Sequence, residues 1–169
     1  PFCRRVCPYC DFAVVAGTGL ADRYAQALIA EIQRAPRFDR PLDAVAFGGG
    51  TPTALPVQEL AAILEVLERS FGFAPEVEIS IEANPEDLDS DTAHGLRTAG
   101  FNRVSLGVQS FDDDVLQRLG RVHSATQAAA AITTAQAVFD SVNVDLIFGA
   151  DGETLESWRS SLETALGTG

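Results

Sequence analysis

The chain has 169 residues, of which 46% are hydrophobic, and its 24 acidic and 12 basic side chains give a formal net charge of −12. This length suits one globular domain with one core, and the negative charge argues against nucleic acid as a partner. All twelve basic residues are arginine, so a Walker A phosphate loop and a pyridoxal Schiff base, which both need lysine, are excluded.

The sequence carries no targeting or membrane signal. No run approaches the ~18 apolar residues of a transmembrane segment, and no basic-then-apolar leader opens the chain. We therefore expect a cytoplasmic protein. Because the chain contains no methionine, we also expect it to be a fragment of a longer protein.

Helical and strand patterns alternate along the chain. Apolar spacing of three and four residues predicts helices, and short β-branched runs predict strands. The expected helices are 20–35, 56–71, 89–99, 112–119, 125–139 and 154–166, with Thr154 as a cap, and the expected strands are 42–47, 76–82, 102–108 and 141–149. This order favours an α/β fold with a parallel sheet and helical crossovers.

The faces of the strands distinguish two parallel architectures. In 76–82 and 102–108, apolar residues alternate with polar or small ones, and in 141–149 the pattern places Phe148 on the apolar face and Asp145 on the polar face. An open sheet covered on both sides should be apolar on both faces. The pattern therefore favours a wide or partial (β/α) barrel with a polar lumen.

The carboxyl ends of the strands are the expected location of a site, because parallel α/β folds bind ligands there. These ends carry Gly48–Thr51, Glu82–Asn84, Gln109 with Ser110, and Asp145–Gly149. The glycine run lets a ligand approach the backbone, although a simple tight turn would use the same residues.

Three cysteines with C-x3-C-x2-C spacing open the chain. Cys3, Cys7 and Cys10 are the only cysteines, so an even disulfide framework is not available. A zinc site would need a fourth ligand, and His94 and His123 lie far along the chain. An iron-sulfur cluster with three thiolate ligands and one open iron is the favoured interpretation.

The cysteine motif, with Tyr9 before the last cysteine, resembles the signature of the radical S-adenosylmethionine (SAM) superfamily. Together with "GGGTPT", "SIEANP", "NRVSLGVQSF", "LGRVH" and "VDLIFG", in this order, it resembles the oxygen-independent coproporphyrinogen III oxidase family. The resemblance covers nearly the whole chain. It implies a partial (β/α) barrel of radical SAM type, truncated at both ends: residues 1–169 would be the core domain, without its first strand and its carboxyl-terminal domain.

The resemblance also implies cofactor ligands. Cys3, Cys7 and Cys10 would bind a 4Fe-4S cluster whose fourth iron is chelated by SAM, and reductive cleavage of SAM would generate a 5′-deoxyadenosyl radical. The residues implied in SAM binding are Tyr9, Gly49, Gly50, Thr51, Glu82, Gln109, Arg121, Asp145 and Ile147.

Individual roles follow from the same resemblance. Arg121 would pair with the SAM carboxylate, Glu82 would accept hydrogen bonds from SAM, and Gln109 would hold its ribose or nearby polar atoms. Asp145 and Ile147 would flank the nucleoside, and Tyr9 would lie beside the adenine. His123 belongs to a motif but receives no role.

Two functions of different classes remain open. The family contains oxidases that decarboxylate coproporphyrinogen III and a branch of heme chaperones. The oxidases carry a further cysteine two residues after the last cluster ligand, where this chain has Phe12, so the heme chaperone branch is favoured. Heme or a porphyrinogen, an electron donor and a heme-acceptor protein are the implied partners. A barrel with a zinc-bound cysteine loop is the third alternative.

Overall fold

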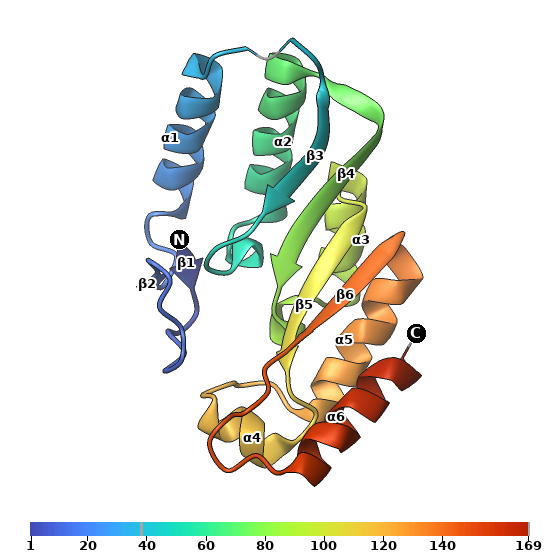
Figure 1. Ribbon diagram of the computed structural model, residues 1–169. Helices are drawn as coiled ribbons and strands as arrows, with labels where there is room; N and C mark the ends of the chain where they lie inside the picture. Colours follow the sequence, from blue (N-terminus) through green and yellow to red (C-terminus); the bar gives the residue numbers. More distant parts are fainter. Residues whose placement is uncertain (38, 169) are drawn as a thin grey trace.

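Four parallel strands form the central sheet, in the order β3-β4-β5-β6. The computed structural model describes residues 1–37 and 39–168. The strands are β3 (Leu42–Phe47), β4 (Phe73–Ala83), β5 (Arg103–Gln109) and β6 (Ser141–Leu146) (Figure 1). Strands that are neighbours in the chain are neighbours in the sheet, a common arrangement for parallel strands joined by helical crossovers, and the predicted α/β class is confirmed.

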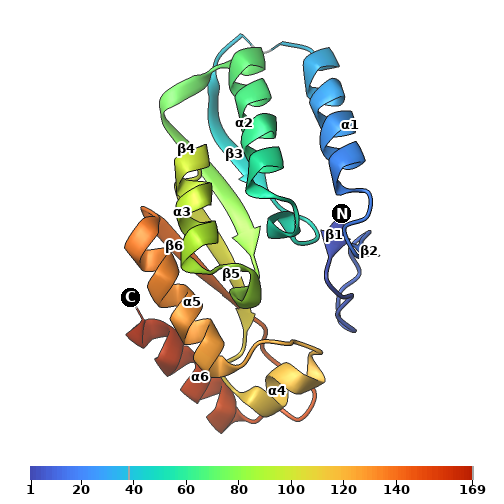
Figure 2. The ribbon, with the colours of Figure 1, turned by 180° about the vertical axis from the view of Figure 1, so that it is seen from behind.

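The helices lie mostly on one face of this sheet. They are α1 (Ala21–Arg34), α2 (Val57–Phe71), α3 (Ser90–Ala99), α4 (Asp113–Arg118), α5 (Ala125–Val138) and α6 (Leu155–Gly167), with the 3-10 turns η1 (Pro52–Ala54) and η2 (Pro85–Asp87). Seen from behind, α2, α3 and α5 cover the sheet, α1 stands beside α2, and α6 runs beside α5 (Figure 2). The other face of the sheet is left to the polar side chains, as in an incomplete barrel.

The core forms where the apolar face of the sheet meets these helices. Val104, Leu106 and Val108 of β5 are completely buried, whereas the residues between them are half-buried. Alanines on the inner side of α5, together with Ile132, pack in the same core. Burial of each of these β5 side chains contributes about 1.5–3 kcal/mol to stability. The alternation of apolar and polar residues in the sequence therefore decides which face of the sheet packs against the helices.

Side-chain caps fix the starts of the later helices. Thr154, the predicted cap, forms a capping box with Ser157 at the start of α6, and Ser124 forms one with Gln127 at the start of α5. Each such cap stabilises its helix by about 1 kcal/mol. The helices that follow β5 and β6 are thereby held at defined starting points.

Some predicted boundaries were wrong. β6 ends at Leu146 rather than Gly149, so Phe148 does not continue the apolar face; it is 76% exposed and its ring lies 5.9 Å from that of Trp158. Gly149, with φ of 76°, turns the chain away from the sheet. A short parallel pair, β1 (Phe2–Cys3) with β2 (Val15–Ala16), was not predicted because two-residue strands carry no periodic pattern.

No helix within residues 1–37 and 39–168 is long and apolar enough to cross a membrane.

The outer edge of β3 pairs with no strand within the part of the chain that the structure describes. Beside it, apolar side chains of α1, α2 and β3, among them Leu28, Val45 and Leu60, line a groove of about 290 Å³. A further strand before Pro1 would suit this edge, but that strand and the division of the protein into domains stay predictions.

We predict that residues 1–169 prepared alone unfold over a broad temperature range and bind a hydrophobic dye before unfolding. The unpaired β3 edge and the apolar groove leave backbone and apolar surface in contact with water. Scanning calorimetry and dye fluorescence measure this. A single sharp transition without dye binding would contradict the prediction.

Candidate cofactor site

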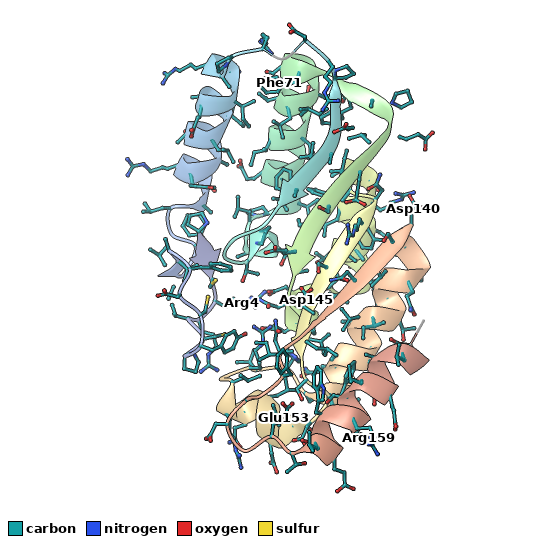
Figure 3. All side chains as sticks on the ribbon, viewed as in Figure 1. Arg4, Phe71, Asp140, Asp145, Glu153 and Arg159 are labelled. Atoms are coloured by element: carbon teal, nitrogen blue, oxygen red, sulfur yellow. The ribbon has the colours of Figure 1, made fainter. Side chains whose placement is uncertain are left out.

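One cavity of about 230 Å³ lies between the cysteine loop and the carboxyl ends of the strands. It collects most of the residues that the resemblance implied. Its lining includes Cys3, Cys7, Cys10, Tyr9, Gly49, Gly50, Thr51, Glu82, Gln109, Arg121 and Asp145. In Figure 3 the sulfur atoms of the cysteine loop lie beside Arg4, on the side of the loop toward Asp145 of β6. Parallel strands all end at this edge, which explains why residues so distant in sequence meet.

The glycine run after β3 anchors the start of the cysteine loop. The backbone N–H of Thr51 donates to the Phe2 carbonyl at 2.7 Å, and the Thr51 hydroxyl donates to Cys3 Sγ at 3.4 Å. A Cβ on Gly50 would lie 2.7 Å from the Phe2 oxygen, so this approach requires glycine. The run is therefore more than a tight turn.

A second anchor holds the loop through Arg4. Arg4 Nε lies 2.6 Å from Asp87 Oδ1, and the Asp87 side chain is almost fully buried in η2. Burial raises the pKa of Asp87, although the positive charge of Arg4 opposes that rise. The contact ties the segment between the first two cysteines to the end of β4.

The remaining cysteines lie on a turn that faces Arg121. The backbone N–H of Cys10 donates to the Cys7 carbonyl at 3.0 Å, and Arg121 Nη1 lies 3.6 Å from Cys7 Sγ. All three cysteines are free thiols. One short loop therefore brings all three thiols to the lining of the same cavity.

Arg121 is fixed by contacts with three elements. Its Nη2 donates to Asn84 Oδ1 at 2.5 Å and to the Gly107 carbonyl at 3.0 Å, while Nη1 lies 3.5 Å from the Tyr9 hydroxyl. Its Nε is buried without a hydrogen-bond partner among the described residues. The guanidinium therefore keeps a donor for a further acceptor.

Electrostatics reinforce this arrangement. Burial opposes the charge of Arg121, but the nearby Tyr9, Glu86 and Cys7 outweigh burial and raise the pKa of the guanidinium. Burial raises the pKa of Tyr9 to about 12, with Cys7 adding to the rise and Arg121 opposing it. At neutral pH Arg121 is thus a cation beside a neutral phenol, which suits an anionic ligand group.

Glu82 closes the cavity on the side of the glycine run. The Gly49 N–H donates to Glu82 Oε2 at 3.1 Å, and Gly49 has φ of 113°. A Cβ on Gly48 would lie 2.7 Å from Glu82 Oε1. The glycines therefore make room for the carboxylate as well as turning the chain.

Gln109 has an unusual backbone. With φ of 72° it is the only non-glycine residue in the left-handed region within the described part of the chain. The strand register shifts here, and the side-chain amide lies over Gly107, where a Cβ would be 2.9 Å from its nitrogen. A non-glycine residue in this conformation costs about 1–3 kcal/mol of stability, and residues of this kind concentrate at functional sites.

Asp145 is held on the lumen side by two residues that sequence reasoning missed. Ser105 Oγ donates to Asp145 Oδ2 at 2.9 Å, and Asn143 Nδ2 donates to Asp145 Oδ1 at 2.7 Å and to Ser105 Oγ at 2.8 Å. The sequence did contain an indication of their role, because Ser105 and Asn143 lie on the polar face of their strands. Asn84, the partner of Arg121, was visible only as a polar residue at a strand end.

Ile147 stands apart from the other residues. It is half-buried, follows the end of β6 and does not line the cavity; its backbone N–H donates to the Gln109 carbonyl at 2.9 Å. The early end of β6 removes it from the face that Asp145 occupies. Its contact with a nucleoside stays a prediction.

The donor set fits an iron-sulfur cluster by its chemistry. Within the described residues, no group of three or more His, Cys, Asp or Glu side chains is arranged to hold a single metal ion. A cluster binds each thiolate to a different iron, so three thiols facing one cavity are the relevant feature. The unpartnered Arg121 Nε and the glycine cradle likewise fit a polar, carboxylate-bearing cofactor.

Comparison with known proteins decides the family. The sequence profile described as "Radical SAM superfamily" matches residues 1–165. The chain belongs to the radical SAM superfamily. The implied cofactors of that superfamily are a 4Fe-4S cluster and SAM, and the radical SAM fold type predicted from the motifs is confirmed.

More specific relatives are similar over nearly the whole chain or all of it. The heme chaperone HemW of Synechocystis sp. is 40% identical over 100% of this chain and 43% of its own length. The oxygen-independent coproporphyrinogen III oxidase of Salmonella typhimurium is 37% identical over 96% of this chain and 37% of its own. The structure of the radical SAM enzyme coproporphyrinogen III oxidase (HemN) from Escherichia coli superposes with a TM-score of 0.88 and 33% identity, covering 100% of this chain and 40% of that one. The chain thus spans less than half the length of these relatives.

We predict that Cys7→Ala abolishes iron and sulfide binding after anaerobic reconstitution, because the two remaining thiolates are too few to hold a cluster that needs three. Colorimetric iron and sulfide analysis measures the result. Val6→Ala, an exposed neighbour on the same loop, should retain full content. Full iron and sulfide in Cys7→Ala would overturn the ligand assignment.

We further predict that Gln109→Gly stabilises the protein by about 1 kcal/mol, because glycine adopts positive φ without strain. Gln26→Gly, the same substitution at an exposed position within α1, should destabilise by about 1 kcal/mol. Midpoints of urea denaturation of the complete protein compare the two. Equal losses at both positions would show that Gln109 stores no strain.

Proposed function

We propose that this protein holds a 4Fe-4S cluster on Cys3, Cys7 and Cys10, binds SAM in the adjoining cavity, and serves as a heme chaperone. The observation that carries the proposal is the meeting of the cysteine loop, the glycine run and the strand-end polar residues around one cavity. No zinc or disulfide alternative explains why these other elements converge there.

The residues around the cavity suit distinct parts of SAM. Arg121, with its free Nε donor, would take the carboxylate, and the glycine run would leave the amino and methionine portions close to the backbone. Glu82, Gln109 and Asp145 would accept or donate hydrogen bonds to the remaining polar atoms. When bound, the cluster and SAM together supply one-electron chemistry that the polypeptide lacks.

The heme chaperone is favoured over the oxidase by the loop itself. Phe12 occupies the position where the oxidases of the family carry a further cysteine, and this residue is part of the cavity lining. The similarity to the heme chaperone HemW of Synechocystis sp., at 40% identity, points the same way. Heme would then be the cargo, received and passed to an acceptor protein.

The alternative is SAM-dependent oxidative decarboxylation of coproporphyrinogen III. It is supported by the TM-score of 0.88 to the Escherichia coli oxidase structure and by the 37% identity to the Salmonella typhimurium oxidase. Both functions share the cluster and SAM and differ in what enters the lumen. Under both proposals the protein receives electrons from an electron donor and lies in the cytoplasm.

The deciding experiment reconstitutes the complete protein anaerobically and titrates it with heme, following iron content and the heme absorption band. We expect about four irons per chain, as a 4Fe-4S cluster requires, and saturable heme binding. Four irons without heme binding, together with decarboxylation of coproporphyrinogen III, would favour the oxidase. No iron would overturn the cluster itself.

A further inference from the structure

His123 is fully buried and bonded on both sides of its ring. It is 3% exposed, its Nε2 lies 2.9 Å from the Val108 carbonyl oxygen, and its Nδ1 lies 3.1 Å from Glu86 Oε2. The ring therefore joins β5 to η2. Its place in the chain, two residues after Arg121, gave no indication of these partners.

Both partners of the His123 ring are hydrogen-bond acceptors. A carbonyl oxygen can only accept, so Nε2 must donate to Val108. Burial disfavours the charge of Glu86, but the hydrogen bond from His123, a backbone N–H and the charge of Arg121 lower the pKa of its carboxyl. Glu86 is thus an acceptor as well, so the His123 ring is held between two acceptors.

Glu86 is one of three carboxylates that line the cavity, with Glu82 and Asp145. Each is engaged by a neighbour: Glu82 by the Gly49 N–H, Asp145 by Ser105 and Asn143, and Glu86 by His123. Within the described residues, the ion pair of Glu86 is with His123 and not with Arg121. The Nε of Arg121 meanwhile remains unpartnered.

A free Glu86 would compete for Arg121. A carboxylate near a guanidinium with a vacant donor forms a charge-assisted bond, and bidentate pairs are especially favourable. Such a pair would occupy the very donor that an incoming carboxylate needs. Restraining Glu86 therefore has a direct consequence for what Arg121 can bind.

We propose that His123 is a positioning residue that holds the Glu86 carboxylate away from Arg121 and so keeps the guanidinium available for the carboxylate of SAM. The inference rests on the proposed SAM site. It gives His123 a role in affinity for the cofactor rather than in the reaction.

The test is a double-mutant cycle on the cluster-loaded protein, with the SAM dissociation constant measured by calorimetry. We expect His123→Gln to weaken SAM binding about tenfold, because Glu86 then pairs with Arg121. Adding Glu86→Gln to His123→Gln should recover most of the loss, because the double variant has no carboxylate at position 86 to compete for Arg121. His94→Gln, at the other histidine, which is exposed on α3, is the matched control.

The outcomes separate the possible failures. If the unmodified protein with its cluster binds no SAM, the proposed function fails. If it binds SAM and His123→Gln binds equally well, or if the double variant is as weak as His123→Gln, the positioning role is wrong. Iron content and melting temperature, recorded for every variant, identify a general loss of structure.

A second measurement does not depend on any variant. Selective nitrogen-15 labelling of the two histidines reports by NMR whether each ring nitrogen takes part in a hydrogen bond. We expect both ring nitrogens of His123 to be hydrogen-bonded, one to the Val108 carbonyl and one to Glu86. A His123 ring without the bond to Glu86 would overturn the inference even if His123→Gln failed to fold.

Discussion

The half-buried guanidinium of Arg121 connects the parts from which the site is built. It bonds to Asn84 after β4 and to the Gly107 carbonyl in β5, and it reaches Tyr9 and Cys7 of the opening loop. The glycine run and Arg4 also hold the thiol-bearing loop to the sheet edge, through the Thr51 N–H and Asp87. An arginine suits this place because one planar group can donate in several directions at once.

The remaining geometry follows from parallel strands. Their carboxyl ends lie at one edge, so Glu82, Gln109 and Asp145 are neighbours although long crossovers separate them in sequence. The helices occupy the apolar face, which leaves the polar face free to line a cavity. The left-handed backbone at Gln109 shows that the fold tolerates local strain to place one amide at this edge.

The charges in the cavity are likewise determined by local contacts. The chain is strongly acidic, yet the three carboxylates of the cavity each have a hydrogen-bonding partner and the central arginine keeps a vacant donor. An acidic protein can in this way present a local positive centre to a carboxylate-bearing cofactor. Local pairing, rather than net charge, decides what such a cavity binds.

The sequence by itself determined the alternation of strands and helices, the apolar and polar strand faces, the Thr154 cap and the cysteine spacing, because each depends on local period or on neighbouring residues. It also placed most site residues at strand ends. Only the tertiary structure decided that Ile147 leaves the cavity, that Ser105 and Asn143 hold Asp145, and that His123 meets Glu86. These outcomes depend on where β6 ends and on contacts between side chains up to 40 positions apart, which no local pattern encodes.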